Sequence, residues 1–261
     1  MSAITPPEPR PLFLAPHYDD VALSCGGTVA ALAAAGPPPL IVTCFGGAPS
    51  GPLSAFARFQ HARWGVGPDD AVCIRRAEER AAAAALGAEA RWLDLRDAIY
   101  RGTRYTSDDE LFGPIHPDDR GLVDELVAAV AALAAPGAAL YVPLGVGNHV
   151  DHQLVTLAGQ RLAARGHPVL AYEDFPYAGD PAGRDALQAR AAAVAGGPPQ
   201  TRFLTPAQLA ARVRAIRCYR SQLPVIFRHQ GDPAAATRRY ACVVGDGRPA
   251  ERFWPLRPAD R

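Results

Sequence analysis

Two short segments, far apart in the sequence, carry histidines and acidic residues at matching spacings. Residues 17–20 read His-Tyr-Asp-Asp, and residues 149–152 read His-Val-Asp-His. Histidine nitrogens and carboxylate oxygens are ligands for Zn²⁺, and three protein ligands leave a coordination position open for water. A further carboxylate beside that water could accept its proton, which is the general-base chemistry of a hydrolase. The two segments therefore predict a metal-dependent hydrolytic site.

Both segments follow apolar runs that are typical of buried strands. Leu12–Ala15 precedes the first segment, and Ala139–Val142 precedes the second after a short glycine loop. Open α/β sheets bind ligands at the carboxyl ends of their strands, so this placement is the one that such a site requires. The spacing of three residues within each segment lets a turn, or the first turn of a helix, direct both end residues to one side. Asp19 leaves the same turn and is expected to lie close to the metal-bound water.

Strand-like and helix-like segments alternate along the chain, which favours a mostly parallel sheet covered by helices. We predict one three-layer α/β domain over residues 11–261, after a flexible N-terminal segment at residues 1–10. The predicted strands are Leu12–Ala15, Leu40–Phe45, Arg91–Leu95, Ala139–Val142 and Val169–Tyr172, with a late edge strand at Tyr240–Val244. The predicted helices are Asp20–Ala35, Arg75–Leu86, Leu122–Ala135, Val150–Arg165 and one that begins at Thr205. Ala98–Pro117 and Phe175–Arg202 fit neither pattern and are expected to be lids or binding loops.

Composition limits the class of partner. The 261 residues carry a formal net charge of +1 without a basic stripe, which argues against a nucleic-acid partner. No apolar run approaches the ~20 residues that span a bilayer, and the proline-rich start does not resemble a signal peptide. The five cysteines are scattered, as expected for reduced thiols in a cytoplasmic protein. Whether the chain forms a homo-oligomer stays open.

The same segments carry a resemblance to a known family. Residues 15–28 (Ala-Pro-His-Tyr-Asp-Asp-Val-Ala-Leu-Ser-Cys-Gly-Gly-Thr) resemble the N-terminal signature of the PIG-L/LmbE-like zinc-dependent deacetylases, and residues 149–152 resemble its second metal motif. Weaker matches at residues 75–79, 84–87 and 219–222 extend the similarity from about residue 11 to about residue 223. The resemblance implies a Rossmann-like fold and hydrolysis of an N-acyl group, usually acetyl, from a small amino-sugar glycoside.

The resemblance also implies roles for individual residues. It makes His17, Asp20 and His152 the metal ligands, for Zn²⁺ or for Fe²⁺, which accepts the same donor set. It makes Asp19 the general base.

The second segment supplies the remaining implied roles. His149 would stabilise the tetrahedral intermediate or protonate the leaving amine, and Asp151 would orient it. The sequence also departs from the family pattern. Tyr18 stands where the family usually has proline, and no tyrosine lies just before His149, where some members carry one that binds the oxyanion. The oxyanion-binding role is therefore unassigned.

Three further residues are candidates for binding substrate. Arg76 could hydrogen-bond sugar hydroxyls or a carboxylate, although a solvated helix face explains it equally well. Glu173 and Asp174 follow a predicted strand, so they could bind substrate hydroxyls or support a metal ligand from behind.

Residues 116–119 read His-Pro-Asp-Asp and match the usual letters of the first family motif better than residues 17–20 do. They follow a polar run and not a buried strand. We therefore predict that they cap the start of the helix at Leu122, with a lid role for His116 as the lesser alternative.

Two other classes of protein fit these motifs less well. A non-catalytic metal or carbohydrate-binding module could use the same pocket, but it could dispense with Asp19, which is present. A phosphatase with an aspartate nucleophile needs an Asp-x-Asp pattern after its first strand, and here the two acids are adjacent.

Overall fold

The computed structural model describes residues 9–67, 69–179 and 181–259. The predicted flexible segment at residues 1–10 thus lies almost wholly outside the described residues. The strands are β1 Leu12–Ala15, β2 Leu40–Thr43, β3 Glu89–Trp92, β4 Leu140–Pro143, β5 Val169–Tyr172, β6 Gln200–Phe203 and β7 Ala250–Pro255. The α-helices are α1 Asp20–Ala35, α2 Ala55–Trp64, α3 Ala71–Leu86, α4 Asp108–Leu111, α5 Leu122–Ala131, α6 Val150–Ala164, α7 Pro181–Val194, α8 Pro206–Ile216, α9 Leu223–Ile226 and α10 Pro233–Val244. Short 3₁₀ turns are η1 Ala98–Tyr100, η2 Pro117–Asp119 and η3 Tyr177–Gly179.

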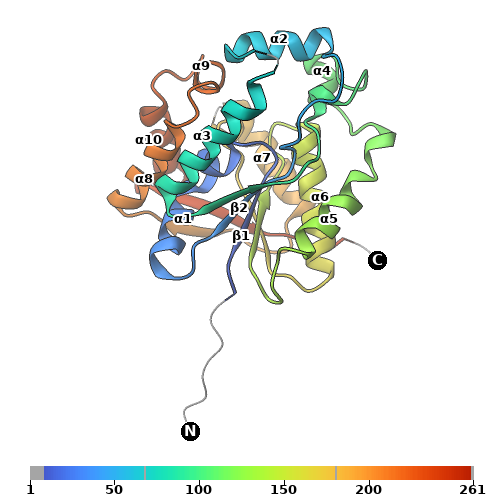
Figure 1. The fold of residues 1–261 in the computed structure, drawn as a ribbon. Coiled ribbons are helices and arrows are strands. Elements are labelled where there is room, and N and C mark those ends of the chain that lie inside the picture. The colour runs from blue at the N-terminus through green and yellow to red at the C-terminus, as the bar shows by residue number, and fades with distance from the viewer. Residues whose placement is uncertain (1–8, 68, 180, 260–261) are drawn as a thin grey trace.

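The strands form one sheet in the middle of the molecule (Figure 1). Their order is β3-β2-β1-β4-β5-β7-β6. The pairs from β3 to β5 are parallel, and β7 runs antiparallel to both β5 and β6. Because the chain first builds outward from β1 to β3 and then returns to β4 on the other side of β1, the direction of winding reverses between β1 and β4. Crevices of open α/β sheets form at such a reversal.

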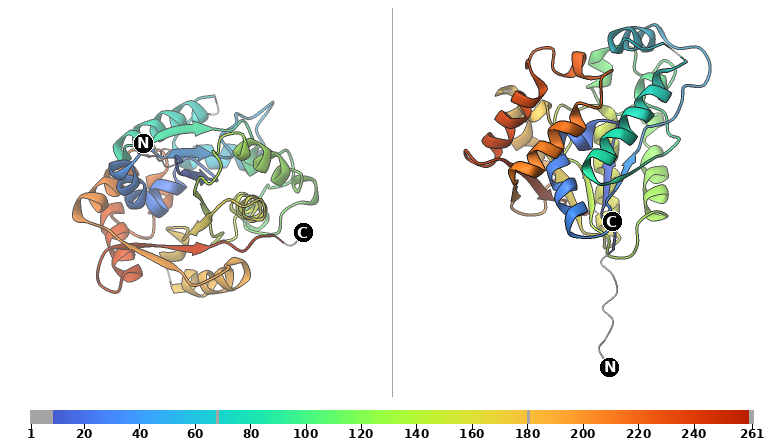
Figure 2. Two further views of the ribbon diagram at one scale, coloured as in Figure 1. Left: turned by 90° about the horizontal axis from the view of Figure 1, so that it is seen from below. Right: turned by 60° about the vertical axis from the view of Figure 1, so that its left-hand side comes forward.

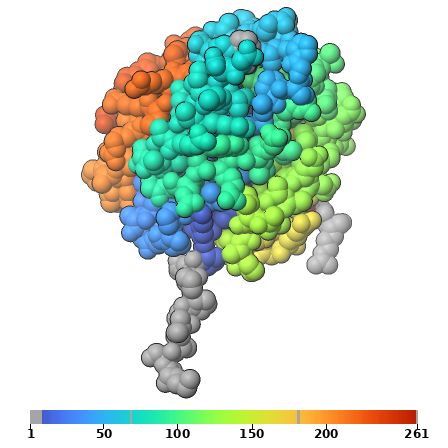
Figure 3. Space-filling model, in the orientation of Figure 1, coloured from blue at the N-terminus to red at the C-terminus, as the bar shows by residue number. Residues whose placement is uncertain are grey.

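Helices cover both faces of the sheet (Figure 2). Helices α1, α3 and α8 pack together on one face, and α5 and α6 pack on the other. Alternate residues of β1 belong to the two layers: Leu12 and Leu14 pack with the α5/α6 side, and Phe13 and Ala15 with the α1/α3/α8 side. This is the period of two that a strand buried on both faces requires. In Figure 3, α2 and α3 (light blue to teal) cover much of the face in view.

The elements around the two histidine segments were predicted most accurately. β1, β5 and α1 have the predicted bounds, and α8 begins after Thr205 with a complete capping box that includes Gln208. The fold class is confirmed as a single α/β domain with a mostly parallel sheet.

The predicted edge strand at Tyr240–Val244 is wrong, because these residues end helix α10. Asp232 accepts the backbone N–H of Ala235 and caps the helix, and Pro233 stands at its first position. The buried residues Ala236, Tyr240 and Val244 repeat every four positions, which is a helical period. The late strand is instead β7, which lies between β5 and β6.

The expectation that Phe175–Arg202 is a binding loop is also mostly wrong. The segment contains η3, α7 and the first part of the edge strand β6. Leu187, Ala191 and Val194 of α7 join the main hydrophobic core. Among the described helices, none combines the length and apolar composition that crossing a bilayer demands.

Candidate active site

The sheet brings the two histidine segments together at one edge. β1 and β4 are parallel neighbours, with Leu12 opposite Leu140 and Phe13 opposite Tyr141. Residues 17–20 follow the carboxyl end of β1, and residues 149–152 open helix α6 after β4. Both segments thus meet at the crevice where the winding reverses.

His17, Asp20 and His152 present their donor atoms to one another. Nδ1 of His17 lies 3.6 Å from Oδ2 of Asp20, and Nε2 of His152 lies 3.5 Å from Oδ1 of Asp20. A ligand atom from each of the three residues falls within 4.8 Å of the other two. A cation that sits about 2.0–2.2 Å from each ligand fits between atoms spaced in this way.

In both histidines, the ring nitrogen that faces away from Asp20 contacts a carboxylate. Nδ1 of His152 lies 2.7 Å from Oδ1 of Asp174, and Nε2 of His17 lies 3.0 Å from Oδ2 of Asp151. The other oxygen of Asp174 accepts the backbone N–H groups of Gly145 and Val146. These contacts fix the ring orientations and leave Nε2 of His152 and Nδ1 of His17 facing Asp20, as in metal sites whose histidines have carboxylate partners.

A second group, His17 with His149 and Asp151, also has its donor atoms within 4.8 Å of one another. It suits a metal less well because Asp151 is already engaged. Its Oδ2 accepts the backbone N–H of Ala98 at 3.0 Å, and its Oδ1 lies 2.6 Å from the guanidinium of Arg101. The set of His17, Asp20 and His152 is therefore the better ligand set.

The charges around these ligands favour a cation. Burial acts to lower the pKa of His17, but the nearby carboxylates, Asp97 first, raise that pKa well above its usual value. Burial likewise opposes protonation of His152, and Asp20 outweighs it, so the pKa of His152 is raised. Burial would raise the pKa of Asp20, yet the two histidines hold it well below its usual range. The donor set thus fits a positively charged occupant.

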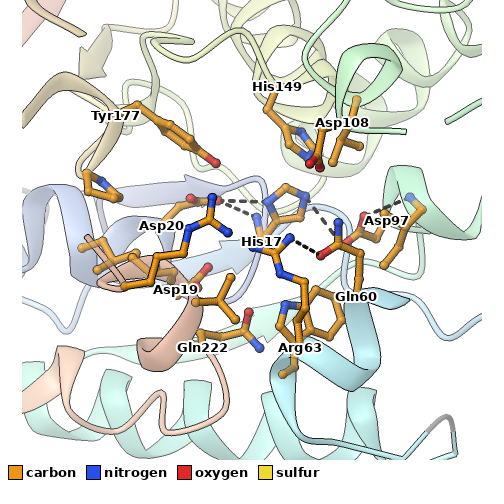
Figure 4. Close-up of a pocket in the computed structure, with 18 of the residues that line it drawn as sticks. His17, Asp19, Asp20, Gln60, Arg63, Asp97, Asp108, His149, Tyr177 and Gln222 are labelled. Atoms are coloured by element: carbon orange, nitrogen blue, oxygen red, sulfur yellow. Dashed lines mark hydrogen bonds and ion pairs between the residues drawn. The ribbon is translucent and has the colours of Figure 1, made fainter. Parts of the chain in front are cut away.

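Asp19 is buried beside this cluster and lines the cavity (Figure 4). Burial raises its pKa, and Arg75 opposes the shift with a guanidinium nitrogen 3.8 Å from Oδ1 of Asp19. A carboxylate with a raised pKa is a stronger base, which suits it to accept a proton from water.

The arginine that lies beside Asp19 is Arg75, whereas the candidate for binding substrate predicted from the sequence is its neighbour Arg76. Arg75 lines the cavity and lies over the rings of Tyr18 and Trp64. Arg76 instead donates to the Tyr18 hydroxyl at 3.2 Å and to the carbonyl oxygen of Gly46 at 2.8 Å. The structure places Arg76 behind the site, where it is not among the residues that line the cavity.

The predicted acid pair divides into two roles. Asp174 supports His152, whereas Glu173 points into a separate buried cluster. The carboxylate of Glu173 accepts hydrogen bonds from the Tyr240 hydroxyl at 2.7 Å and from Trp254 Nε1 at 3.1 Å. The structure does not bring Glu173 to the cavity.

His149 caps helix α6, with its Nδ1 accepting the backbone N–H of Asp151 at 3.1 Å. Asp151 contacts His149 through this backbone N–H, while its carboxylate holds His17. Burial lowers the pKa of His149 well below its usual value, and His17 adds to this. A neutral ring whose Nδ1 accepts a hydrogen bond carries its hydrogen on Nε2, so His149 is a hydrogen-bond donor.

His116 caps the short turn η2, where its Nδ1 accepts the backbone N–H of Asp118. His116 thus has the predicted capping role, but it caps η2 and not the helix at Leu122, whose N-cap residue is Gly121. Asp119 from the same segment is buried and pairs with Arg101 and Arg104.

The site opens into a cavity of about 550 Å³. Two segments of its wall lie in Ala98–Pro117 and Phe175–Arg202, which the sequence marked as lids or binding loops; the other two were not singled out, because they reach the cavity only through tertiary packing. The inner end of the cavity is polar, and its outer wall comes from four segments. These are α2 with Arg63 and Trp64, α4 and its end with Leu111 and Phe112, the turn η3 with Tyr177, and residues 222–230 with Val225, Ile226 and Arg228.

Comparisons with known proteins agree with this geometry. Residues 12–163 match the PIG-L family, described as GlcNAc-PI de-N-acetylase. The 2′-N-acetylparomamine deacetylase of Niallia circulans is 32% identical over 183 residues, or 64% of this chain and 66% of the relative. That of Streptomyces fradiae is 40% identical over 187 residues, or 68% of this chain and 60% of the relative. The aligned part thus spans just under two thirds of each relative.

Two solved structures match nearly the whole chain. The zinc-inhibited form of teicoplanin deacetylase Orf2 is 26% identical with a TM-score of 0.81, covering 96% of this chain and 99% of its own. The A40926 pseudoaglycone deacetylase Dbv21 is 27% identical with a TM-score of 0.76, covering 97% and 99%. With the family match covering more than half of its residues, the chain belongs to the PIG-L family, and these relatives are deacetylases.

Proposed function

We propose that the protein is a metal-dependent N-deacetylase that removes acetyl from the amino group of an amino-sugar natural-product intermediate. The observation that carries the proposal is the cluster of His17, Asp20 and His152, with the buried carboxylate Asp19 beside it in a cavity. The names of the relatives, which include 2′-N-acetylparomamine deacetylases and glycopeptide deacetylases, support an amino-sugar substrate.

His17, Asp20 and His152 would hold the divalent cation, with Zn²⁺ as first choice and Fe²⁺ compatible with the same donors. Such an ion supplies Lewis acidity and lowers the pKa of a bound water to near 7.

The chain's own residues account for the proton transfers. Asp19 accepts a proton from the water whose oxygen attacks the amide carbonyl carbon. His149 offers the hydrogen on Nε2 to the developing oxyanion. The C–N bond then breaks, and the proton held by Asp19 passes to the leaving nitrogen, so the products are acetate and a free amine.

The test is acetate release from a panel of N-acetylated amino sugars, measured with chelator and after adding back Zn²⁺ or Fe²⁺. We expect activity that chelation abolishes and metal restores. Asp19→Asn should retain the metal and lose about 10²–10⁴-fold in rate, the usual contribution of general-base catalysis.

Two outcomes would contradict this assignment. Binding of the panel without acetate release would favour a binding module. Loss of metal in Asp19→Asn, with metal and activity kept in Asp20→Asn, would reverse the roles of the two acids.

A further inference from the structure

Tyr177 enters the cavity from the turn η3, on a segment that follows β5 and not β1 or β4. In Figure 4 its hydroxyl points inward, toward the space that His149 borders from the other side and that lies above His17 and Asp20. Tyr177 is half-buried, and among the described residues its hydroxyl makes no hydrogen bond, so its donor is free at the cavity surface. A partner from bound substrate would satisfy it.

The ring of Tyr177 is held in a fixed position. It packs against Gly147, which adopts a φ of +88°, and a Cβ atom at that position would lie 2.6 Å from Cγ of Tyr177. The ring also meets the edges of two neighbours, His152 at 6.0 Å and Phe112 at 6.1 Å between centroids. A side chain fixed in this way donates its hydrogen bond without first losing freedom of rotation, which is the preorganisation that catalytic donors need.

A tyrosine hydroxyl keeps its proton at neutral pH, so Tyr177 can act as a neutral hydrogen-bond donor.

We propose that Tyr177 is a further catalytic residue, whose hydroxyl donates a hydrogen bond to the amide oxygen as that oxygen becomes an oxyanion. This inference rests on the proposed deacetylase function. It adds a second oxyanion donor to His149, and this donor comes from the segment after β5, across the cavity from His149.

The test is Tyr177→Phe, which keeps the ring packed on Gly147 and removes only the hydroxyl. Loss of one preorganised oxyanion donor typically lowers kcat by about 10²–10³-fold, and we expect a fall of this size with KM, metal content and Tm close to wild type. Tyr240→Phe is the matched control, because it also removes a buried tyrosine hydroxyl, one that bonds Glu173 outside the cavity. It should keep full kcat.

The outcomes separate this inference from the proposed function. A wild-type protein that releases no acetate from the whole panel in the presence of metal overturns both. An active wild type with an equally active Tyr177→Phe overturns this inference alone. A variant with raised KM and unchanged kcat also overturns it, because the hydroxyl would then bind substrate and transition state equally.

Discussion

At the scale of single residues, a chain of buried ion pairs reaches one of the proposed metal ligands. Asp151 is fully buried, and its carboxylate joins Nε2 of His17 to the guanidinium of Arg101. Arg101 in turn lies 3.1 Å from Asp119. Because each group in this series of ion pairs has a charged partner, the series holds the His17 ring at a fixed angle and leaves no charge among these residues unpaired.

We expect Asp151→Asn to weaken metal binding. The amide keeps the size of the side chain but removes the charge that holds His17, and loss of such a supporting group typically costs 10- to 100-fold in metal affinity. Competition with a chromogenic chelator measures the effect. His116→Ala serves as the control and should bind metal as wild type does, because His116 only caps a 3₁₀ turn. Equal affinity in Asp151→Asn and wild type would show that Asp151 does not position the ligand.

Glu79 gives the stability of the protein a specific pH dependence. Burial raises the pKa of its carboxyl to about 8; a hydrogen bond from Tyr219 opposes the shift, and Asp19 adds to it. The carboxyl is protonated in both folded and unfolded chains below about pH 4.3. Between there and pH 8 only the unfolded chain ionises, so this group makes the folded state less stable as pH rises.

Glu79→Gln should remove that dependence, because the amide oxygen still accepts from Tyr219 and carries no charge. In the presence of chelator, we expect the unfolding free energy of the variant relative to wild type to increase from pH 5 to pH 8. The increase should be on the order of 1.4 kcal/mol for each unit by which folding raises the pKa of Glu79. Urea titrations at several pH values measure it. A difference that stays constant with pH would show that Glu79 ionises normally in the fold.

The sequence could predict the site residues that lie in local motifs but not those that only tertiary packing brings in. His17, Asp20 and His152 follow strand ends at readable spacings. Choosing Arg75 over Arg76 requires the rotation of helix α3, because adjacent helical positions point about 100° apart. Tyr177 lies in a segment without a recognisable pattern, so only the packing of η3 against Gly147 reveals it.

At the scale of elements, helix α1 is bent beneath the site that its first residue serves. Cys25 has non-helical angles, φ −144° and ψ 24°. The backbone N–H groups of Gly27 and Thr28 after the bend donate to the carboxylate of Glu251 from β7, at 2.9 and 2.7 Å. Glu251 therefore acts as a cap for the second half of the helix, and buried Arg212 balances its charge at 3.2 Å.

We expect Glu251→Ala to destabilise the fold by about 3–5 kcal/mol, because it leaves the Arg212 charge buried without its partner. Two helix N–H groups would also lose their acceptor. The midpoint of urea unfolding measures the loss. Glu89→Ala is the control, since its pairing with Arg10 lies at the surface and such pairs are worth at most about 1 kcal/mol. Similar midpoints for the two variants would contradict a capping role for Glu251.

The two strands missed from the sequence, β6 and β7, lack the continuous apolar pattern of a buried strand. β6 reads Gln-Thr-Arg-Phe and is largely exposed at the sheet edge, so it lacks the apolar pattern of a buried strand. The core of β7 is interrupted by Glu251, whose burial is explained only by the bend in α1. Apolar patterns predict strands that are buried on both faces, and they miss a strand that is exposed or that carries a buried charge serving another element.

At the scale of the whole molecule, the residues for the chemistry follow the strands of the sheet, and three outer segments join the turn η3 in forming the cavity wall. Helix α2, the residues around α4 and residues 222–230 surround the mouth, as the upper part of Figure 1 shows for α2, α4 and α9. They present Trp64, Phe112 and Ile226 together with the cationic side chains of Arg63 and Arg228. These segments are therefore placed to contact the part of a substrate that does not react.

We expect the choice of substrate to follow this outer wall. Replacing residues 222–230 with the corresponding segment of a relative should change the order of kcat/KM across a panel of N-acyl glycosides. Metal affinity should stay constant, because His17, Asp20 and His152 are fixed by the sheet and its first helical turns. An exchange of α7 is the control, since its buried face packs in the core and it should leave the order unchanged. If exchanging α7 changes the order of kcat/KM values and exchanging residues 222–230 does not, residues 222–230 do not determine the choice of substrate.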